Sequence, residues 1–94
     1  MEDDFTRMLA DRFRTRAASD YSGLLDALQA NDLERVFALS HALSGTAGTL
    51  GFPEISKHAE NLERAVDAGQ TDVWQVAYPL VEALRALSCG TDGS

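Results

Sequence analysis

Cysteine is almost absent from this sequence, and it contains neither a basic cluster nor a long apolar run. The single cysteine, Cys89, excludes an intramolecular disulfide and fits a reducing, cytoplasmic setting. The 15 acidic and 8 basic side chains give a net charge of −7. Such a surface repels phosphate backbones and anionic lipids, so we expect no nucleic-acid or membrane partner. No apolar run approaches the about 18 residues of a membrane span, and the acidic start, Met1 to Asp4, lacks the apolar segment of a signal peptide.

Alternation of apolar and polar residues at period two is also missing, which argues against β-strands. Apolar residues instead recur at spacings of three and four, which is typical of amphipathic helices. We expect helices over about 3–12, 14–30, 33–50, 53–69 and 72–89. The first two could form one continuous helix, because no glycine or proline separates them.

Several residues mark where these helices begin and end. Asn31 suits a left-handed helix end, and Asp32 suits the N-cap that follows. Gly51 ends the next helix, and Pro53 suits the first turn of the one after it. Thr71 and Asp72 are alternative N-caps for the last helix. Pro79 lies inside that helix and should kink it or shorten its first half.

The predicted fold is an all-α, antiparallel up-and-down four-helix bundle with a short extra helix at the N-terminus. Connections of two to four residues favour antiparallel neighbours. The chain length fits one domain, residues 1–90, followed by a flexible tail, residues 91–94. We expect Phe13, Tyr21, Trp74 and the leucines to supply most of the core.

The helix over 33–50 has one face with little side-chain bulk, and this face carries His41. With about 100° per residue, His41 lies about 160° from Leu43, which marks the core direction. The same outer face holds Glu34, Phe37, Ala38, Gly45 and Gly48. An interior helix glycine costs about 1 kcal/mol relative to alanine, so two on one face indicate close approach of a partner or of an adjacent helix. These residues alone leave open that the glycines serve helix packing and that His41 is an incidental surface residue.

The spacing His-x-x-x-Gly-x-Ala-Gly-x-x-Gly, followed by Leu-Glu on the next helix, resembles the histidine-containing phosphotransfer (HPt) domain family. The matching residues are His41, Leu43, Gly45, Ala47, Gly48, Leu50, Gly51, Leu62 and Glu63. The resemblance covers the two helices expected over about residues 33–69. The Gly51-Phe52 ending resembles the phosphotransfer domain of chemotaxis-type histidine kinases.

This resemblance implies that His41 is phosphorylated. Its Nε2 would attack an aspartyl phosphate on a receiver domain and later return the phosphoryl group to another receiver. Glu63 would accept a hydrogen bond from Nδ1–H and fix the tautomer, although Glu63 taken alone is better explained as a solvated surface residue. The receiver would dock on the His41 face, through Phe37, Ala38, Ser44, Gly45 and Gly48.

The resemblance also implies the partners, which are response-regulator receiver domains and a hybrid sensor histidine kinase. The receiver would bring the Mg²⁺, so we expect no cofactor and no metal on this chain, and we expect a monomer. No Gly-rich loop ending in Lys-Ser/Thr is present, so phosphorylation from ATP is not expected. Whether such a carrier is called an enzyme is partly convention.

One departure from the family pattern is Ser44, which stands where the family usually has a lysine. That lysine can pair with phosphoryl oxygens, whereas serine offers only a neutral donor. Lys57 or Arg64, from the next helix, could substitute. A receiver-binding module that carries no phosphate is therefore an alternative. A helical adaptor unrelated to signalling is a third, and it would be indicated by a buried His41.

Two further residues carry reactive side chains but no motif. His58 lies within about 40° of Leu62, at the edge of the apolar stripe, so we interpret it as packed or partly buried. Cys89 has no histidine or aspartate pattern around it, and we interpret it as a buried or terminal thiol.

Overall fold

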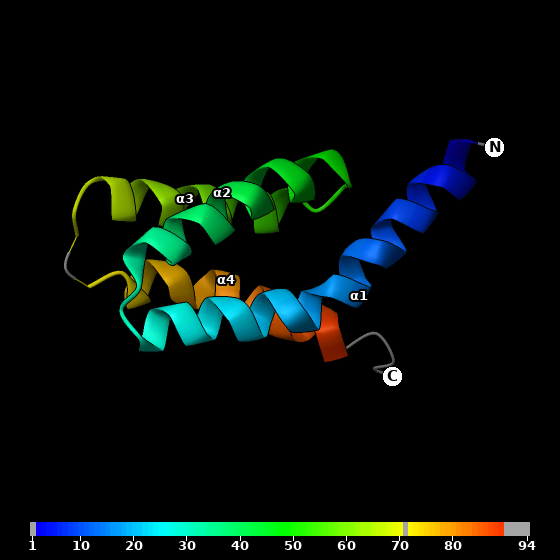
Figure 1. Cartoon of the computed structure of the whole chain (residues 1–94). Helices are drawn as coiled ribbons and strands as arrows, with labels where there is room; N and C mark the ends of the chain where they lie inside the picture. Colours follow the sequence, from blue (N-terminus) through cyan, green and yellow to red (C-terminus); the bar gives the residue numbers. More distant parts are fainter. Residues whose placement is uncertain (1, 71, 90–94) are drawn as a thin grey trace.

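The computed structural model describes residues 2–70 and 72–89 and contains four helices within these ranges. They are α1 (Glu2–Gln29), α2 (Leu33–Thr49), α3 (Pro53–Asp67) and α4 (Trp74–Cys89). The helices run up and down, and α2 and α3 lie beside α1 and α4 (Figure 1). The predicted all-α four-helix bundle is therefore confirmed. The predicted tail, residues 91–94, lies outside the described residues.

The separate N-terminal helix is a wrong prediction, because α1 continues without a break from Glu2 to Gln29. Its first turns extend past the ends of α2 and α3 (Figure 1). The helix continues because no glycine or proline occurs before Gly23, which is also why the sequence left a single helix possible. Local side-chain contacts between Arg14 and Asp11 (3.4 Å) and between Thr15 and the Asp11 carbonyl (2.9 Å) lie at the expected junction.

The core lies where α1 packs on α4 and α2, and where α3 packs on α2 and α4. Its largest fully buried hydrophobic side chains are Leu24, Val36, Leu62, Leu80 and Leu84. Phe13 is buried as predicted, and Tyr21 is half-buried and packs against the core.

The prediction that Trp74 belongs to the core is wrong, because 40% of its surface is exposed. The buried side of this segment carries Val73, Ala77 and Leu80, at spacings of four and three. Trp74 follows Val73 by one residue, and about 100° of rotation turns it away from that side.

The residues predicted to end and begin helices do so. Asn31 has a positive φ of 57°, the left-handed conformation that asparagine tolerates better than most residues. Asp32 caps α2 by accepting a hydrogen bond from the Arg35 N–H at 3.3 Å. Gly51 has a φ of 92°, and Pro53 is the first residue of α3. Asp72 accepts a hydrogen bond from the Trp74 N–H at 3.1 Å, whereas Thr71 lies outside the described residues.

The helix α4 begins at Trp74 and continues through Pro79 to Cys89, so proline does not end it. Proline has no N–H, and the carbonyl of Gln75, four residues earlier, therefore lacks its intrahelical donor. Both residues are exposed, so water can reach this carbonyl. Across the described residues, every helix is too short or too polar to span a bilayer.

Candidate functional site

The site is built on α2, which buries one side and exposes the other. Its buried residues are Val36, Ser40, Leu43 and Ala47. His41 lies on the opposite side, and 71% of its side chain is exposed. The exposure predicted from helix geometry is confirmed, and the buried His41 that would indicate an unrelated adaptor is not found.

The imidazole of His41 is held by a residue from the neighbouring helix. Its Nδ1 lies 2.8 Å from Oε2 of Glu63 on α3. Glu63 follows the fully buried Leu62, and its side chain is only 22% exposed. An ionised carboxylate only accepts hydrogen bonds, so the donor is Nδ1–H. In the neutral ring, Nε2 then has the free lone pair and is directed away from Glu63.

An aromatic ring one helical turn before His41 lies against the imidazole. The ring centroids of Phe37 and His41 are 6.2 Å apart, and the two planes are nearly parallel, at 2°. Phe37 is half-buried and Ala38 is exposed. The side of the imidazole facing the start of α2 is therefore apolar.

The two glycines of α2 have different surroundings. A Cβ built on Gly45 would meet no atom within 4 Å, so this position faces open space on the outer side of the helix. A Cβ on Gly48 would lie 3.1 Å from Oγ of Ser56 on α3. The two explanations that the sequence left open therefore apply to different residues: Gly45 leaves the outer face accessible, and Gly48 allows a close approach of α3.

A shallow hollow lies beside His41 and extends to α1. It is lined by Leu9, His41, Ala42, Gly45, Thr46, Thr49 and Leu50. Several of these residues also line a deeper groove between α1 and α2, together with Arg12, Phe13, Arg16 and Asp20. Sequence reasoning missed the contribution of Leu9 and the two threonines. No spacing rule could bring Leu9 to His41, because the contact depends on how α1 packs against α2.

The groove contains a carboxyl group in an unfavourable setting. Burial raises the pKa of the Asp20 carboxyl above its ordinary value, and the nearby Arg16 guanidinium partly offsets this effect. The two charged groups are 3.8 Å apart.

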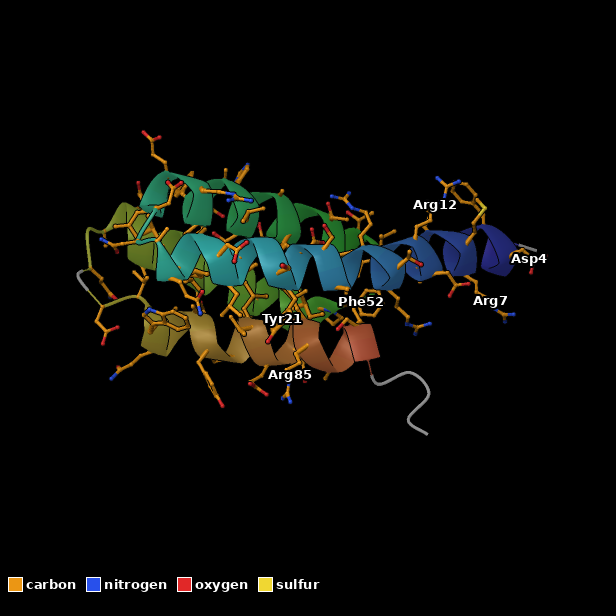
Figure 2. All side chains as sticks on the ribbon, turned by 60° about the horizontal axis from the view of Figure 1, so that its bottom comes forward. Asp4, Arg7, Arg12, Tyr21, Phe52 and Arg85 are labelled. Carbon is orange, nitrogen blue, oxygen red and sulfur yellow. The ribbon has the colours of Figure 1, made fainter. Side chains whose placement is uncertain are left out.

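Arg12 lies on the part of α1 that extends past the bundle (Figure 2). Phe52 lies under α1, where its ring stacks on that of Phe13, with the ring centroids 4.9 Å apart (Figure 2).

Comparison with known families supplies the observation that decides the identity of this fold. The model of the Hpt domain family matches residues 8–88, which is more than half of the chain. This chain belongs to the Hpt domain family. Comparisons with curated proteins and with solved structures gave no significant match. Hpt domains are phosphotransfer modules of two-component signalling, and they interact with receiver domains and kinases in phosphorelays.

In this Hpt domain, the serine that departs from the family pattern has its hydroxyl and its carbonyl engaged in hydrogen bonds. The Ser44 hydroxyl donates to the His41 carbonyl at 2.9 Å, and the Ser44 carbonyl accepts from the Ser56 hydroxyl at 2.7 Å. On α3, Arg64 is paired with Glu60 at 3.1 Å, and Lys57 is exposed. Among the described residues, the polar partner of His41 is Glu63, so the role of either cation as a substitute for the family lysine stays a prediction.

The remaining candidate residues are His58 and Cys89. His58 is half-buried on α3, in agreement with its expected packing. Cys89 closes α4, but its side chain lies outside the described part of the chain. Among the described residues, no three histidine, cysteine or acidic side chains are grouped as metal ligands.

Proposed function

We propose that this Hpt domain carries a phosphoryl group on His41 between the aspartates of receiver domains in a multistep relay. The observation that carries the proposal is the hydrogen bond between His41 Nδ1 and Glu63 Oε2, at 2.8 Å, on an imidazole that is 71% exposed. This bond selects the tautomer whose free lone pair is on Nε2. The nucleophile is therefore oriented before the partner arrives, which lowers the entropic cost of the reaction.

In the proposed transfer, Nε2 attacks the phosphorus of an aspartyl phosphate on the receiver. The new N–P bond forms as the P–O bond breaks, and the receiver recovers a free carboxylate. The ring then carries positive charge, which the Glu63 carboxylate stabilises through the Nδ1–H bond. Transfer to a second receiver is the reverse reaction. A neutral imidazole needs no general base, so we assign the bond-making chemistry on this chain to His41, oriented by Glu63.

The partner contributes the rest of the chemistry. The oxygens of the transferring group carry charge that Mg²⁺ neutralises in phosphoryl transfer, and we assign this ion to the receiver. We assign docking to the open face around His41, with Phe37, Ala38, Ser44, Gly45 and Gly48. A hybrid sensor kinase would supply the phosphoryl group. We place the relay in the cytoplasm and treat the carrier as a monomer.

The decisive experiment measures acid-labile, alkali-stable phosphate on this protein. The protein is mixed with Mg²⁺ and a receiver that has been charged with acetyl phosphate. We expect labelling of the wild type and of His58→Gln, the control that removes the other histidine, and no labelling of His41→Gln. Labelling of His41→Gln would disprove the proposal.

A second candidate function is a receiver-binding module that carries no phosphate, and Ser44 is the observation that favours it. Its hydroxyl is bonded to the His41 carbonyl and offers no positive charge to a phosphoryl group. If this candidate is correct, receivers bind but no cognate receiver labels His41. Ser44→Lys restores the family cation, so labelling of that variant alone would identify the lysine as the missing group.

A further inference from the structure

The structure contains a second polar link between α2 and α3, separate from the bond between His41 and Glu63. The Ser56 hydroxyl on α3 donates to the Ser44 carbonyl on α2 at 2.7 Å. We propose that Ser56 is a positioning residue, which holds α3 at the place along α2 where Glu63 reaches His41. This inference rests on the proposed function of His41 as the nucleophile.

The link needs the close approach that Gly48 allows. A Cβ on Gly48 would lie 3.1 Å from the Ser56 Oγ, which is tighter than ordinary van der Waals contact. An alanine at this position would require the Ser56 side chain or α3 to move by a few tenths of an ångström, which would lengthen or bend the bond to the Ser44 carbonyl. Gly48 therefore costs helix propensity in exchange for a contact between helices.

The start of α3 has few other polar attachments. Its N-cap residue, Phe52, makes no side-chain capping bond, and Pro53 occupies the first helical position without an N–H. Phe52 instead packs its ring on Phe13 of α1. An aromatic stack tolerates sliding, whereas a hydrogen bond depends steeply on distance and angle. The Phe52 N–H also donates to the Ala47 carbonyl of α2 at 2.8 Å. Ser56 adds a directional side-chain contact to α2, one turn into α3.

The site depends on this placement because its own bond tolerates little movement. Helix side chains lean toward the N-terminus of their helix, so on antiparallel helices His41 and Glu63 lean toward each other. A shift of α3 by one residue, about 1.5 Å, would lengthen or bend the 2.8 Å contact and so weaken it. Once unbound from Glu63, the neutral imidazole can place its proton on Nε2, and that tautomer is not nucleophilic at Nε2.

The test measures the His41 tautomer directly, by long-range ¹H–¹⁵N NMR of the free protein at a pH where the ring is neutral. In Ser56→Ala we expect a larger fraction of the Nε2–H tautomer than in the wild type. We also expect transfer from a charged receiver to slow by about 2- to 10-fold, the effect of one lost neutral hydrogen bond. Ser56→Thr keeps the hydroxyl and should show the tautomer fraction and the transfer rate of the wild type.

Two further variants serve as controls. Ser88→Ala removes a half-buried serine whose hydroxyl bonds within α4, to the Arg85 carbonyl, and it should change neither value. Gly48→Ala should raise the Nε2–H fraction in the wild-type background but not further in Ser56→Ala, because both act on the same bond.

Three outcomes are distinguishable. A wild-type tautomer and rate in Ser56→Ala would overturn the positioning role even if His41 is phosphorylated. An altered tautomer in a protein that no receiver labels would support the positioning role and contradict the proposed function. A changed rate with an unchanged tautomer would assign Ser56 to receiver docking and overturn the inference.

Discussion

At the residue scale, the contact between His41 and Glu63 separates two tasks that an imidazole must perform. Nδ1 is fixed by a carboxylate at 2.8 Å, while 71% of the side chain is exposed. Phe37 lies parallel to the ring and restricts its movement toward the start of α2. The imidazole is therefore oriented by Glu63 at Nδ1 and is accessible to solvent elsewhere, which suits a nucleophile that reacts with another protein.

The value of this orientation can be measured by changing Glu63. Glu63→Ala removes a charged hydrogen bond, and we expect transfer from a charged receiver to slow by about 10- to 150-fold. Glu63→Gln keeps a neutral acceptor and should lose much less. Glu60→Gln is the matched control, because Glu60 pairs with Arg64 on the same helix. Equal rates for Glu63→Ala and the wild type would show that Glu63 does not orient the ring.

A second residue-scale prediction concerns Asp20, whose pKa is raised mainly by burial. Its ionised form is disfavoured in the folded state, so Asp20 destabilises the fold above its folded pKa. Below its unfolded value, 3.8, it is protonated in both states and makes no difference. We expect Asp20→Asn to raise the free energy of unfolding at pH 7, with the gain disappearing near pH 3.

Urea unfolding at both pH values measures this effect. Asp26→Asn, which changes an exposed carboxylate on the same helix, is the control and should be nearly neutral at both. A gain for Asp20→Asn that is equal at pH 3 and pH 7 would attribute it to something other than ionisation.

At the element scale, α2 has two contact surfaces besides its buried stripe, one facing outward and one facing α3. Gly45 leaves the outward surface open, and Gly48 allows α3 to approach on the neighbouring one. The sequence of α2 therefore gives up helix stability at two positions for two different contacts. The N-cap bond from Asp32 at the start of α2 offsets part of this loss of helix stability.

The helix α4 carries a different cost, at Pro79. Pro79→Ala restores the donor for the Gln75 carbonyl and removes the ring, so we expect the free energy of unfolding to rise by up to about 3 kcal/mol. Pro53→Ala is the matched control, because Pro53 is the other of the two prolines in the sequence. Because Pro53 is at the first helical position, its replacement should be neutral or cost about 0.5–1 kcal/mol.

Urea unfolding followed by circular dichroism distinguishes these two variants. A loss of stability in Pro79→Ala would mean that the proline ring contributes packing that outweighs the missing hydrogen bond.

At the scale of the whole molecule, the packing of α1 against α2 completes the surface around His41. Leu9, in the N-terminal part of α1, lines the same hollow as His41 and Gly45. The neighbouring groove adds two arginines to a chain with a net charge of −7. The outer face of α2 is therefore one part of a surface that two helices share.

This shared surface predicts that α1 takes part in receiver binding. Leu9→Asp places a charge in the apolar part of the hollow, and we expect the Kd for a receiver to rise by about tenfold or more. Calorimetric titration with the receiver measures the change. Gln75→Asp, on the exposed side of α4, is the control and should bind normally. Unchanged binding by Leu9→Asp would confine docking to α2.

The sequence was a sufficient guide wherever the signal is local. The period of the apolar residues predicted the helices, and Asn31, Gly51 and Pro53 marked their ends correctly, because each of these effects acts within one turn of the chain. The rotation of His41 away from Leu43 is equally local, and it predicted an exposed imidazole. Trp74 shows the limit of the method, because we expected it in the core, yet it follows the buried Val73 by one residue and is turned to the surface.

What only the tertiary structure decided is how separate helices meet. Whether Glu63 reaches His41, whether Gly48 faces solvent or α3, and whether Leu9 joins the site all depend on the placement of one helix along another. Helix periodicity determines which side of each helix is apolar. It does not determine how far that side is shifted along a neighbouring helix, because the apolar residues remain buried after a small shift. The sequence by itself therefore determined the helices and the exposed histidine. Their packing decided which side chains surround that histidine, because directional contacts such as Ser56 to Ser44 form only in the assembled bundle.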